Sequence, residues 1–221
     1  MPAGRATAGR PRERQHDAER TRNEILEIAI KEFSAQGFAG ARVDEIAART
    51  RTTKRMIYYY FGSKEQLYIA ALERAYATIR SLERTIDVDH LGPVAAVRQL
   101  AEVTFDHHEA HPDFIRLVSI ENIHNAEHMA KSERLANLNL PVIDLIEGIL
   151  ERGRSEEVFR RDVDAIDVHM MISAFCVFRI ANRHTFGSLF GRDLIAADRR
   201  EHYRTMLGDM VVEYLSAGKG P

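Results

Sequence analysis

A run of hydroxyl, cationic and thioether side chains begins at Thr53 and could bind the phosphates and base edges of duplex DNA. Lys54, Arg55 and Met56 follow Thr53 directly. The hydroxyl of Thr53 could cap a helix or donate to a phosphate. Arg55 could donate two hydrogen bonds to a guanine, and Met56 could touch a thymine methyl group. We therefore predict that these residues contact DNA from the first turn of a helix.

Three consecutive tyrosines follow this run. Ile57 and Phe61 are spaced by four, so on a helix both would point inward and hold it in place. Tyr58 and Tyr59 would then present their phenol groups to backbone phosphates, whereas Tyr60 is expected in the core. The alternative, in which all three tyrosines are ordinary core residues, stays open at this stage.

Apolar residues recur with helical spacing along the chain, and no segment alternates for long as a strand would. Gly37 is placed to end the first helix, and Ser63 opens a Ser-x-x-Gln capping box. Lys64, in the first turn after that box, could bind a phosphate together with the helix N-terminus. Pro141 should kink or start a helix. The predicted fold class is all-α, with helices at about 17–36, 43–49, 53–59, 64–85, 93–110, 113–124, 128–153, 165–188 and 195–216.

The pattern over about residues 20–72 resembles the TetR family of bacterial transcription regulators. The resemblance implies an N-terminal helix-turn-helix domain of three helices, the third of which enters the major groove. It also implies a C-terminal helical domain that binds a ligand and dimerises, and a regulator, most simply a repressor. The resemblance rests on Ile25, Leu26, Ala29, Phe33, Gly37, Phe38, Val43, Ile46, Ala47, the run from Ile57 to Glu65, and Leu67.

The chain departs from the family pattern at Arg42, Arg51, Thr52 and Arg55, where the family usually has a cap, a small residue, an aliphatic and a small residue. Arg42 stands where the family usually has a capping Ser or Thr, so the cap is given up but a phosphate comes within reach. Arg51 stands where the family usually has a small residue in the turn, and a positive φ would strain an arginine. We predict either a different turn geometry or an extra phosphate contact from Arg51.

Charge is distributed unevenly. Residues 1–64 contain 13 Lys and Arg against 8 Asp and Glu, a net charge of +5, although the whole chain carries −2. Because cations neutralise phosphates, the N-terminal part is where a polyanion would bind. We divide the chain into a basic arm (1–16), a DNA-binding domain (17–64) and a ligand-binding and dimerisation domain (65–221). The arm is expected to be disordered, either solvated or laid along the minor groove; its cations are Arg5, Arg10, Arg12 and Arg14.

A regulator of this kind must be a homodimer, because two recognition helices about 34 Å apart meet successive major grooves of a palindromic operator. In the family, the last two helices of each subunit form a four-helix interface. Those helices match residues 165–188 and 195–216 here. Each candidate for this interface is equally able to lie in the subunit's own core; the candidates are Val168, Ile172, Phe175, Met206, Met210 and Tyr214.

Three C-terminal segments, 158–164, 182–184 and 190–193, are similar to a subgroup that includes the pyrimidine-utilisation regulators. This similarity does not establish a pyrimidine ligand, because sensor pockets diverge on one scaffold. We predict a pocket between the middle helices for an unknown small-molecule effector, with core packing as the alternative for each residue. The apolar candidates are Phe105, Phe114, Leu117, Met171, Phe175 and Phe178, and the polar candidates are Asn122, Arg179 and Asn182.

Histidines near residues 107–111 could share a helix face and hold a metal. The spacing is unspecific and no cysteine joins them, so a solvated helix end is the preferred interpretation. We predict no metal and no other cofactor. The side chains concerned are His107, His108 and His111, with Asp106, Glu109, His124, His128 and His169 as possible further ligands.

Composition limits the remaining possibilities. An apolar fraction of 45% and a charged fraction of 29% are typical of a globular protein. No apolar run approaches about 18 residues, so no membrane span is expected. The single cysteine, Cys176, fits a cytoplasmic location. We find no nucleophile elbow or phosphate-binding loop, so an enzyme is not expected. The alternatives are a dimeric DNA-binding scaffold without a ligand and a metal-dependent hydrolase.

Overall fold

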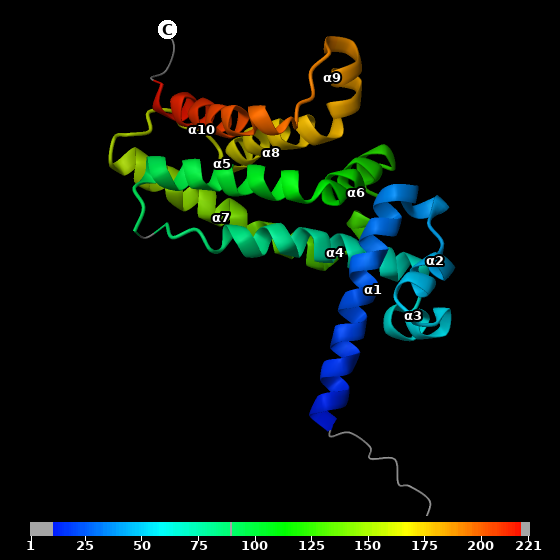
Figure 1. Cartoon of the computed structure of the whole chain (residues 1–221). Coiled ribbons are helices and arrows are strands. Elements are labelled where there is room, and N and C mark those ends of the chain that lie inside the picture. The colour runs from blue at the N-terminus through cyan, green and yellow to red at the C-terminus, as the bar shows by residue number, and fades with distance from the viewer. Residues whose placement is uncertain (1–10, 89, 218–221) are drawn as a thin grey trace, which may run out of the picture. The chain divides into compact units, whose positions relative to one another are not determined.

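The computed structural model describes residues 11–88 and 90–217, with side chains from residue 16 onward except residue 89. Within these residues the chain is helical and contains no strand, so the all-α prediction is confirmed. The first ten residues, which make up most of the predicted basic arm, lie outside the described part. The chain divides into two compact units after Ala71, within the fourth helix (Figure 1).

The N-terminal unit contains three complete helices and the start of a fourth. They are α1 (Pro11–Gly40), α2 (Val43–Arg49), α3 (Lys54–Phe61) and the first part of α4 (Lys64–Glu83). Each helix contributes apolar side chains from one face, because helical spacing brings every third or fourth residue to the same side. The fully buried side chains of this small core are Ile25, Ala29, Phe33, Ile46, Ile57, Leu67, Tyr68 and Ala71.

Glycines end two of these helices where the backbone turns. Gly37 has φ of 68° and breaks the helical conformation inside α1, as the sequence predicts. Gly62 follows α3 with φ of 79°, and its N–H donates to the carbonyl of Tyr58. A residue with a Cβ atom would be strained at either angle. The hydroxyl of Ser63 then accepts from the N–H of Gln66 at 3.1 Å, which confirms the predicted cap of α4.

The C-terminal unit contains the rest of α4 and the helices that follow. After a loop at residues 84–92 come α5 (Pro93–Ala110), α6 (Pro112–Ile123), the short η1 (Met129–Lys131), α7 (Glu133–Ser155), α8 (Ala165–Ala181), α9 (Arg183–Phe190), η2 (Ala197–Arg199) and α10 (Arg200–Ser216). Helix α5 packs against α7, α8 and α10 (Figure 1). It is therefore the central helix of this unit.

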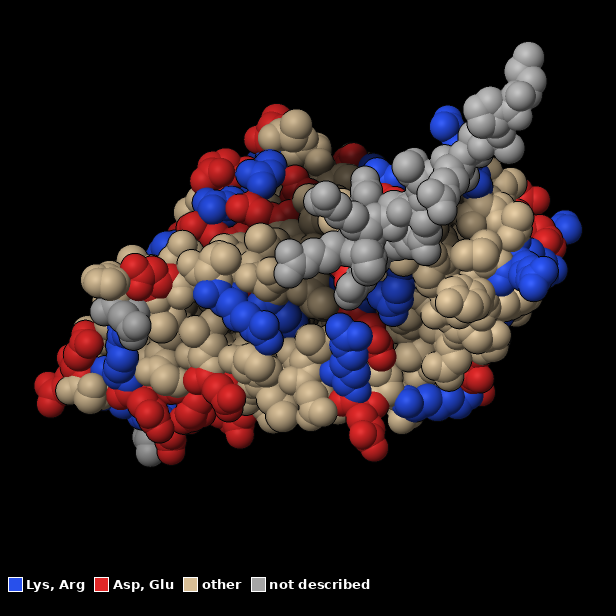
Figure 2. All heavy atoms as spheres, turned by 90° about the horizontal axis from the view of Figure 1, so that it is seen from below, with Lys and Arg blue, Asp and Glu red and all other residues tan. Residues whose placement is uncertain are grey.

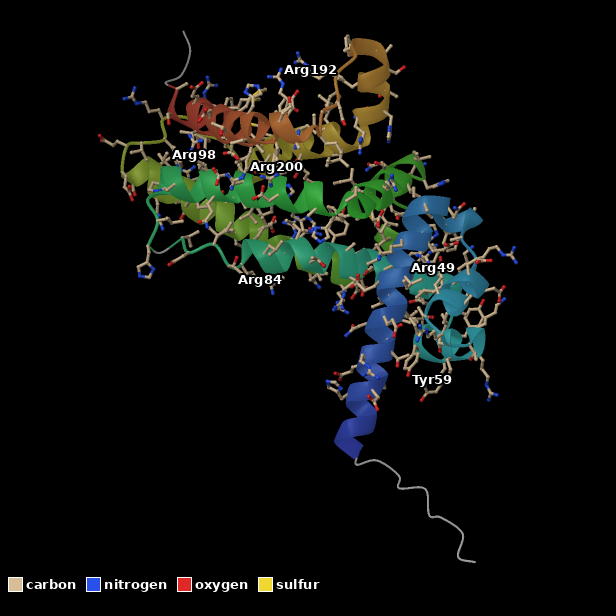
Figure 3. The ribbon with its side chains drawn as sticks, viewed as in Figure 1. Arg49, Tyr59, Arg84, Arg98, Arg192 and Arg200 are labelled. Atoms are coloured by element: carbon tan, nitrogen blue, oxygen red, sulfur yellow. The ribbon has the colours of Figure 1, made fainter. Side chains whose placement is uncertain are left out.

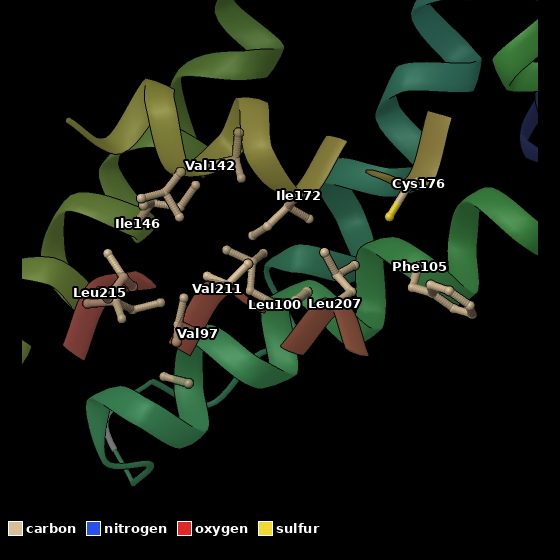
Figure 4. Close-up of a cluster of buried hydrophobic side chains, with 14 of the residues drawn as sticks. Val97, Leu100, Phe105, Val142, Ile146, Ile172, Cys176, Leu207, Val211 and Leu215 are labelled. Carbon is tan, nitrogen blue, oxygen red and sulfur yellow. The ribbon is translucent and has the colours of Figure 1, made fainter. Parts of the chain in front are cut away.

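The core of the C-terminal unit lies around α5. Val97 and Leu100 of α5 meet Leu207 and Val211 of α10 (Figure 4). The other helices complete the cluster with Val142 and Ile146 from α7 and with Val168, Ile172 and Cys176 from α8. Burial of each such side chain contributes about 1.5–3 kcal/mol to stability. Burial also raises the pKa of the Cys176 thiol to about 12, so this cysteine stays protonated.

One predicted helix is wrong. The sequence predicts a single helix over 165–188, but the structure ends α8 at Ala181 and begins α9 at Arg183, with a bend of 68° between them. Helical periodicity continues through Asn182, and no glycine or proline stands at the bend. The sequence therefore gives no signal for it. Pro141, in contrast, lies inside α7 without ending it. The helices predicted at 43–49 and 93–110 have the bounds of α2 and α5.

Among the described residues, no single helix has the length and apolar character needed to cross a membrane; only the bent pair α8 and α9 meets the test when counted together. On the face drawn in Figure 2, Lys and Arg side chains are interspersed with Asp and Glu side chains. Charge on that face is therefore mixed rather than of one sign.

Two glycines of α7 provide a test of this packing. A Cβ atom at Gly153 would overlap the ring of Phe159, whereas a Cβ at Gly148 would meet nothing within 4 Å. We predict that Gly153→Ala lowers the free energy of unfolding by about 1–3 kcal/mol through overpacking. Gly148→Ala should instead raise it by up to about 1 kcal/mol through helix propensity. Urea denaturation measures both, and equal effects of the two changes would contradict this packing.

Candidate nucleic-acid interface and sensor site

Helix α3 is amphipathic over its eight residues. Thr53 caps it, because its hydroxyl accepts from the N–H of Met56 at 3.2 Å. Ile57 is fully buried and Phe61 is 8% exposed, as the sequence predicts. Arg22 of α1 lies over the Phe61 ring, 5.1 Å from its centroid. Two apolar anchors and a capped N-terminus thus fix which face of α3 meets solvent.

The opposite face of α3 carries the predicted DNA-contacting side chains. Tyr59 is 78% exposed and projects from the helix (Figure 3), and Met56 and Tyr58 are each 37% exposed. Arg55 is also exposed, and no hydrogen bond or ion pair ties it to another described residue. Lys54 is exposed and pairs with Asp44 at 3.1 Å. The structure therefore brings these five residues to one solvent-facing surface, which we call the α3 face.

The departures from the family pattern at Arg42 and Arg51 have structural consequences. Arg42 precedes α2 and makes no side-chain cap; instead its N–H donates to Glu32 at 3.3 Å. Glu32 also pairs with Arg49 at 3.5 Å. Arg51 adopts a positive φ of 52°, so the turn keeps the left-handed conformation despite the arginine. The side chain of Arg51 is exposed, so the phosphate contact that the sequence suggests stays a prediction.

Lys64 is half-buried and folded back on the N-terminal unit. Its ammonium group donates to the carbonyl of Ala39 at 3.3 Å and lies 5.0 Å from the centroid of the Phe38 ring. Both contacts hold the charge near the start of α4, where the helix N-terminus also favours an anion. A phosphate contact from Lys64 stays a prediction.

An apolar groove of about 470 Å³ lies between α8 and α10. Four of the predicted ligand-binding residues, Met171, Phe175, Phe178 and Arg179, line it. The groove therefore collects part of the predicted sensor pocket, although on the outer helices rather than between the middle ones. Its other lining residues are Ala174, Leu194, Tyr203, Leu207, Met210 and Val211.

Arg179, predicted to anchor a ligand, already has protein partners. Its guanidinium donates to the carbonyl of Leu194 at 3.0 and 3.2 Å and to Glu109 at 3.0 Å. It also lies 4.0 Å from the centroid of the Phe105 ring. This buried arginine therefore joins α8 to α5 and to the segment before α10 through its Nε and Nη2 donors.

The other predicted ligand-binding residues do not line the groove. Phe105 and Leu117 are fully buried in packing, and Phe114 is 6% exposed. Asn122 is exposed and donates to the carbonyl of Val118 in its own helix. Asn182 lies half-buried at the junction of α8 and α9.

Five of the six predicted dimer residues divide into two groups, and the sixth, Phe175, lines the groove. Val168 and Ile172 are 0% and 2% exposed and belong to the core of their own subunit, so the structure gives them no free surface. Met206, Met210 and Tyr214 are 37–45% exposed and recur every fourth residue along α10. The sequence could not distinguish the two faces of α8, because apolar residues occur on both. The exposed apolar residues of α8 are instead Ile166, Met170 and Phe178, also in steps of four or eight.

Several ion pairs join α5 to α10. Arg200 pairs with Asp106 at 2.6 Å and with Glu109 at 3.1 Å. Arg204 pairs with Glu102 at 2.9 Å and also contacts Asp106. Arg98, which is labelled with Arg200 in Figure 3, pairs with Asp209 at 2.7 Å. The acidic side chains that the sequence analysis placed near the histidines are thus taken up by arginines.

The histidines predicted to be solvated are mostly buried. His107 is 2% exposed and His108 is 5% exposed. His107 stacks on His111 at 4.3 Å between ring centroids, and neither of its ring nitrogens has a hydrogen-bond partner among the residues that the structure describes. His108 uses Nδ1 to bond the carbonyl of Thr104 at 2.8 Å. The solvated interpretation is wrong for these two, because α5 turns this face toward Phe114 of α6.

Burial keeps these imidazoles neutral. It lowers the pKa of His107 to about 3, with help from the nearby His111. It also lowers the pKa of His108 to about 4 and that of His169 on α8 to about 4. The positive charge of Arg80 adds to the lowering of the pKa at all three. Desolvation dominates because a charged ring would lose its hydration.

Residues of α4 that the sequence analysis missed complete this buried polar group. Arg80 and Glu83 are 6% and 3% exposed and pair at 2.6 Å. Burial raises the pKa of Glu83 to about 7 in spite of Arg80, and it lowers the pKa of Arg80. One signal could have revealed them: on a helix, Tyr76, Arg80 and Glu83 share the face of the buried Leu72.

A further carboxylate organises the loop after α6. Glu121 is 1% exposed and accepts from the N–H groups of His128 and Met129 and from the His128 ring.

In the part of the chain that the structure describes, no group of three or more His, Cys, Asp or Glu side chains could hold a metal ion.

Both units match models of one protein family. Residues 25–71 match the family described as bacterial regulatory proteins, tetR family. Residues 93–211 match the tetracyclin repressor-like C-terminal domain. The chain therefore belongs to the TetR family of bacterial transcription regulators.

Relatives and solved structures agree with this assignment. The chain is 35% identical to the HTH-type transcriptional repressor NicS of Pseudomonas putida, over 91% of this chain and 95% of that protein. It is 31% identical to the HTH-type transcriptional regulator RutR of Escherichia coli, over 46% of this chain and 48% of that one. The crystal structure of the putative transcriptional regulator SCO4942 from Streptomyces coelicolor superposes with a TM-score of 0.63 at 27% identity, covering 88% and 97% of the two chains. These proteins are regulators, not hydrolases, so the hydrolase alternative is set aside.

The buried histidines predict how stability depends on pH. Their pKa values are lower in the folded chain than the ordinary 6.5, so the unfolded chain takes up protons first as the pH falls. Above pH 6.5 these histidines should not lower the free energy of unfolding. As the pH falls from 6.5 to about 3, protonation of the unfolded chain should lower it progressively. Each proton contributes a slope of about 1.4 kcal/mol per pH unit.

His107→Leu should flatten that slope by one proton and raise the free energy of unfolding at neutral pH, because it also removes two unpartnered nitrogens. The matched control is His184→Leu at an exposed position of α9. Urea denaturation across the pH range measures both. An unchanged acid slope in His107→Leu would contradict the buried, neutral imidazole.

Proposed function

We propose that this protein is a homodimeric transcription repressor that binds a palindromic operator through α3 and is released by a small-molecule effector. The observation that carries the DNA-binding part is the α3 face, where cations, a thioether and two phenols stand exposed opposite the buried Ile57 and Phe61. The first turn of α3 would read base edges, and the tyrosines would contact phosphates. NicS, the relative that matches over most of its length, is named a repressor.

The dimer part rests on exposed apolar rows on two helices of the C-terminal unit. Ile166, Met170 and Phe178 on α8, and Met206, Met210 and Tyr214 on α10, stand exposed at intervals of one or two turns. The groove between these helices shares Phe178 and Met210 with the two rows. An apolar surface of this kind marks an association site, and a second copy of the same two helices fits it by symmetry.

The effector part rests on α4, which is continuous from the N-terminal unit into the C-terminal unit. A ligand that binds beside the second half of α4 can bias the position of its first half. It does so only to the extent that it binds one arrangement better than the other. The scaffold alternative has no such ligand, and the polar residues buried beside α4 favour the sensor over it.

The α3 face predicts salt-dependent, sequence-specific binding to DNA from the chain's own upstream region. Arg55→Ala should weaken that binding by about 1–3 kcal/mol and relax preference at one base pair, because a bidentate contact to a base is lost. Tyr59→Phe should weaken binding to all sequences, because only a phosphate contact is lost. Fluorescence anisotropy over a range of salt concentrations measures both effects.

The control for these variants is Arg192→Ala, which removes an exposed arginine that lies outside the α3 face (Figure 3). It should leave affinity and salt slope as they are in the parent protein. Equal binding of unrelated DNA by the parent protein, or an equal loss in Arg192→Ala and Arg55→Ala, would refute operator reading by α3.

The exposed rows predict the effect of a charge in the dimer face. Met210→Glu should shift the protein toward monomer by several kcal/mol, because a carboxylate would be buried without a partner. Leu140→Glu, at an exposed leucine of α7 outside the rows, is the matched control and should stay dimeric. Analytical ultracentrifugation distinguishes the two species. A Met210→Glu protein as dimeric as the control would show that the subunits meet elsewhere.

A further inference from the structure

The inner face of α4 carries an ion pair in an unusual place. Arg80 and Glu83 are 94% and 97% buried, and their side chains meet at 2.6 Å. A buried pair of this kind contributes little net stability, because the desolvation of two charges offsets their attraction. Apolar side chains of similar volume would serve packing as well or better. Stability therefore gives no reason for this pair.

The pair is also incompletely satisfied. Nε of Arg80 is buried without a hydrogen-bond partner among the described residues. Burial raises the pKa of Glu83 to about 7, so the carboxylate is held in its charged form only weakly. A guanidinium has five N–H donors, and a single carboxylate cannot occupy all of them. Arg80 thus keeps capacity for a second acceptor.

The charge of Arg80 also acts on three neutral imidazoles of α5 and α8, those of His107, His108 and His169, and lowers their pKa values. Tyr76, one turn before Arg80, packs edge-on against Phe114 with 5.0 Å between ring centroids. A buried arginine provides one strong charge in a water-poor place, which suits recognition of an organic anion.

A small pocket gives access to the pair. It has a volume of about 80 Å³ and is lined by Arg80, Glu83, Arg84, Pro141, Val142 and Leu145. Arg84, labelled in Figure 3, is exposed and adds a second cation at this pocket between α4 and α7. An anion entering here meets two arginines and a single carboxylate.

We propose that Arg80 is the receptor for the carboxylate of a small organic acid, which takes the place of Glu83 on the guanidinium. Glu83 holds this position in the free protein and is the intramolecular competitor of the ligand. The assignment rests on the proposed function, since it identifies the chemical class of the effector.

A carboxylate fits this exchange better than other groups. Its two oxygens match the planar fork of a guanidinium, as those of Glu83 do. When Glu83 turns away, the buried guanidinium of Arg80 loses its negatively charged partner. In a water-poor site, a neutral ligand of equal shape cannot supply that negative charge. Because Arg80 is on α4, occupation of the site acts directly on the helix that both units share.

The experiment compares acids with their neutral amides. Acetate with acetamide, and benzoate with benzamide, are titrated into the full-length protein by isothermal titration calorimetry. Thermal unfolding follows the same pairs. We expect a carboxylate to bind and to raise the unfolding temperature, and its amide to bind at least about tenfold more weakly.

Two variants separate this site from a merely structural pair. Glu83→Gln removes the charged competitor and should tighten carboxylate binding by about tenfold. Arg80→Met combined with Glu83→Leu replaces the pair by apolar groups, which keeps the fold but should abolish carboxylate binding. Arg192→Met, at an exposed site on the loop before α10, is the control and should bind as the parent protein does. A structural role alone would not make Glu83→Gln bind more tightly.

Several results would overturn the assignment: neither carboxylate binds the parent protein, an amide binds as tightly as its acid, or Glu83→Gln fails to bind more tightly. Operator binding by the parent protein, measured without any carboxylate, separates the two proposals. If operator DNA binds and no carboxylate does, only the effector assignment fails. If a carboxylate binds and operator DNA does not, the proposed function fails instead.

Discussion

The burial of Ile57 and Phe61 is the constraint on which the DNA-reading surface depends. Neither side chain touches DNA in the proposed function, yet together they decide which face of an eight-residue helix meets solvent. With those two positions fixed, helical geometry places Arg55, Met56 and Tyr59 outward. The Thr53 cap satisfies one N–H at the end that would meet the bases. The same constraint accounts for Arg51, which accepts a left-handed conformation because packing of the helices on either side sets the turn.

The C-terminal unit shows two different uses of buried charge. Arg179 donates to a carbonyl and a carboxylate and lies over an aromatic ring, and these contacts join α8 to its neighbours. Arg80 pairs with one carboxylate, and its Nε has no hydrogen-bond partner among the described residues. Both arginines lie on apolar-periodic helices and cannot be told apart from sequence. Their difference comes from the partners that the neighbouring helices provide, and these partners already bind the guanidinium of Arg179, the predicted ligand anchor.

Burial also shifts acids and bases here in opposite directions. Glu83 has a raised pKa, so it opposes folding as the pH rises from 4.5 toward 7, whereas the histidines oppose folding as the pH falls below 6.5. The polar group beside α4 therefore costs stability at every pH, and between pH 4.5 and 6.5 Glu83 and the histidines oppose folding together. Buried groups with displaced pKa values are more common at binding sites than in ordinary cores, and this supports a sensor at α4.

The sequence by itself determined the helices, the class of protein and the α3 face, because these follow from local periodicity, capping residues and a motif with fixed spacing. The bounds of α2 and α5, the cap at Ser63 and the positive φ of Gly37 are all local in this sense. Only the tertiary structure decided that Val168 and Ile172 lie in the core while Met170 is exposed, that α8 bends away at Asn182, and that His107 and Arg80 are buried. The physical reason is that burial depends on contacts between residues far apart in the chain. A helix with apolar residues on both faces does not reveal which face its own subunit will cover.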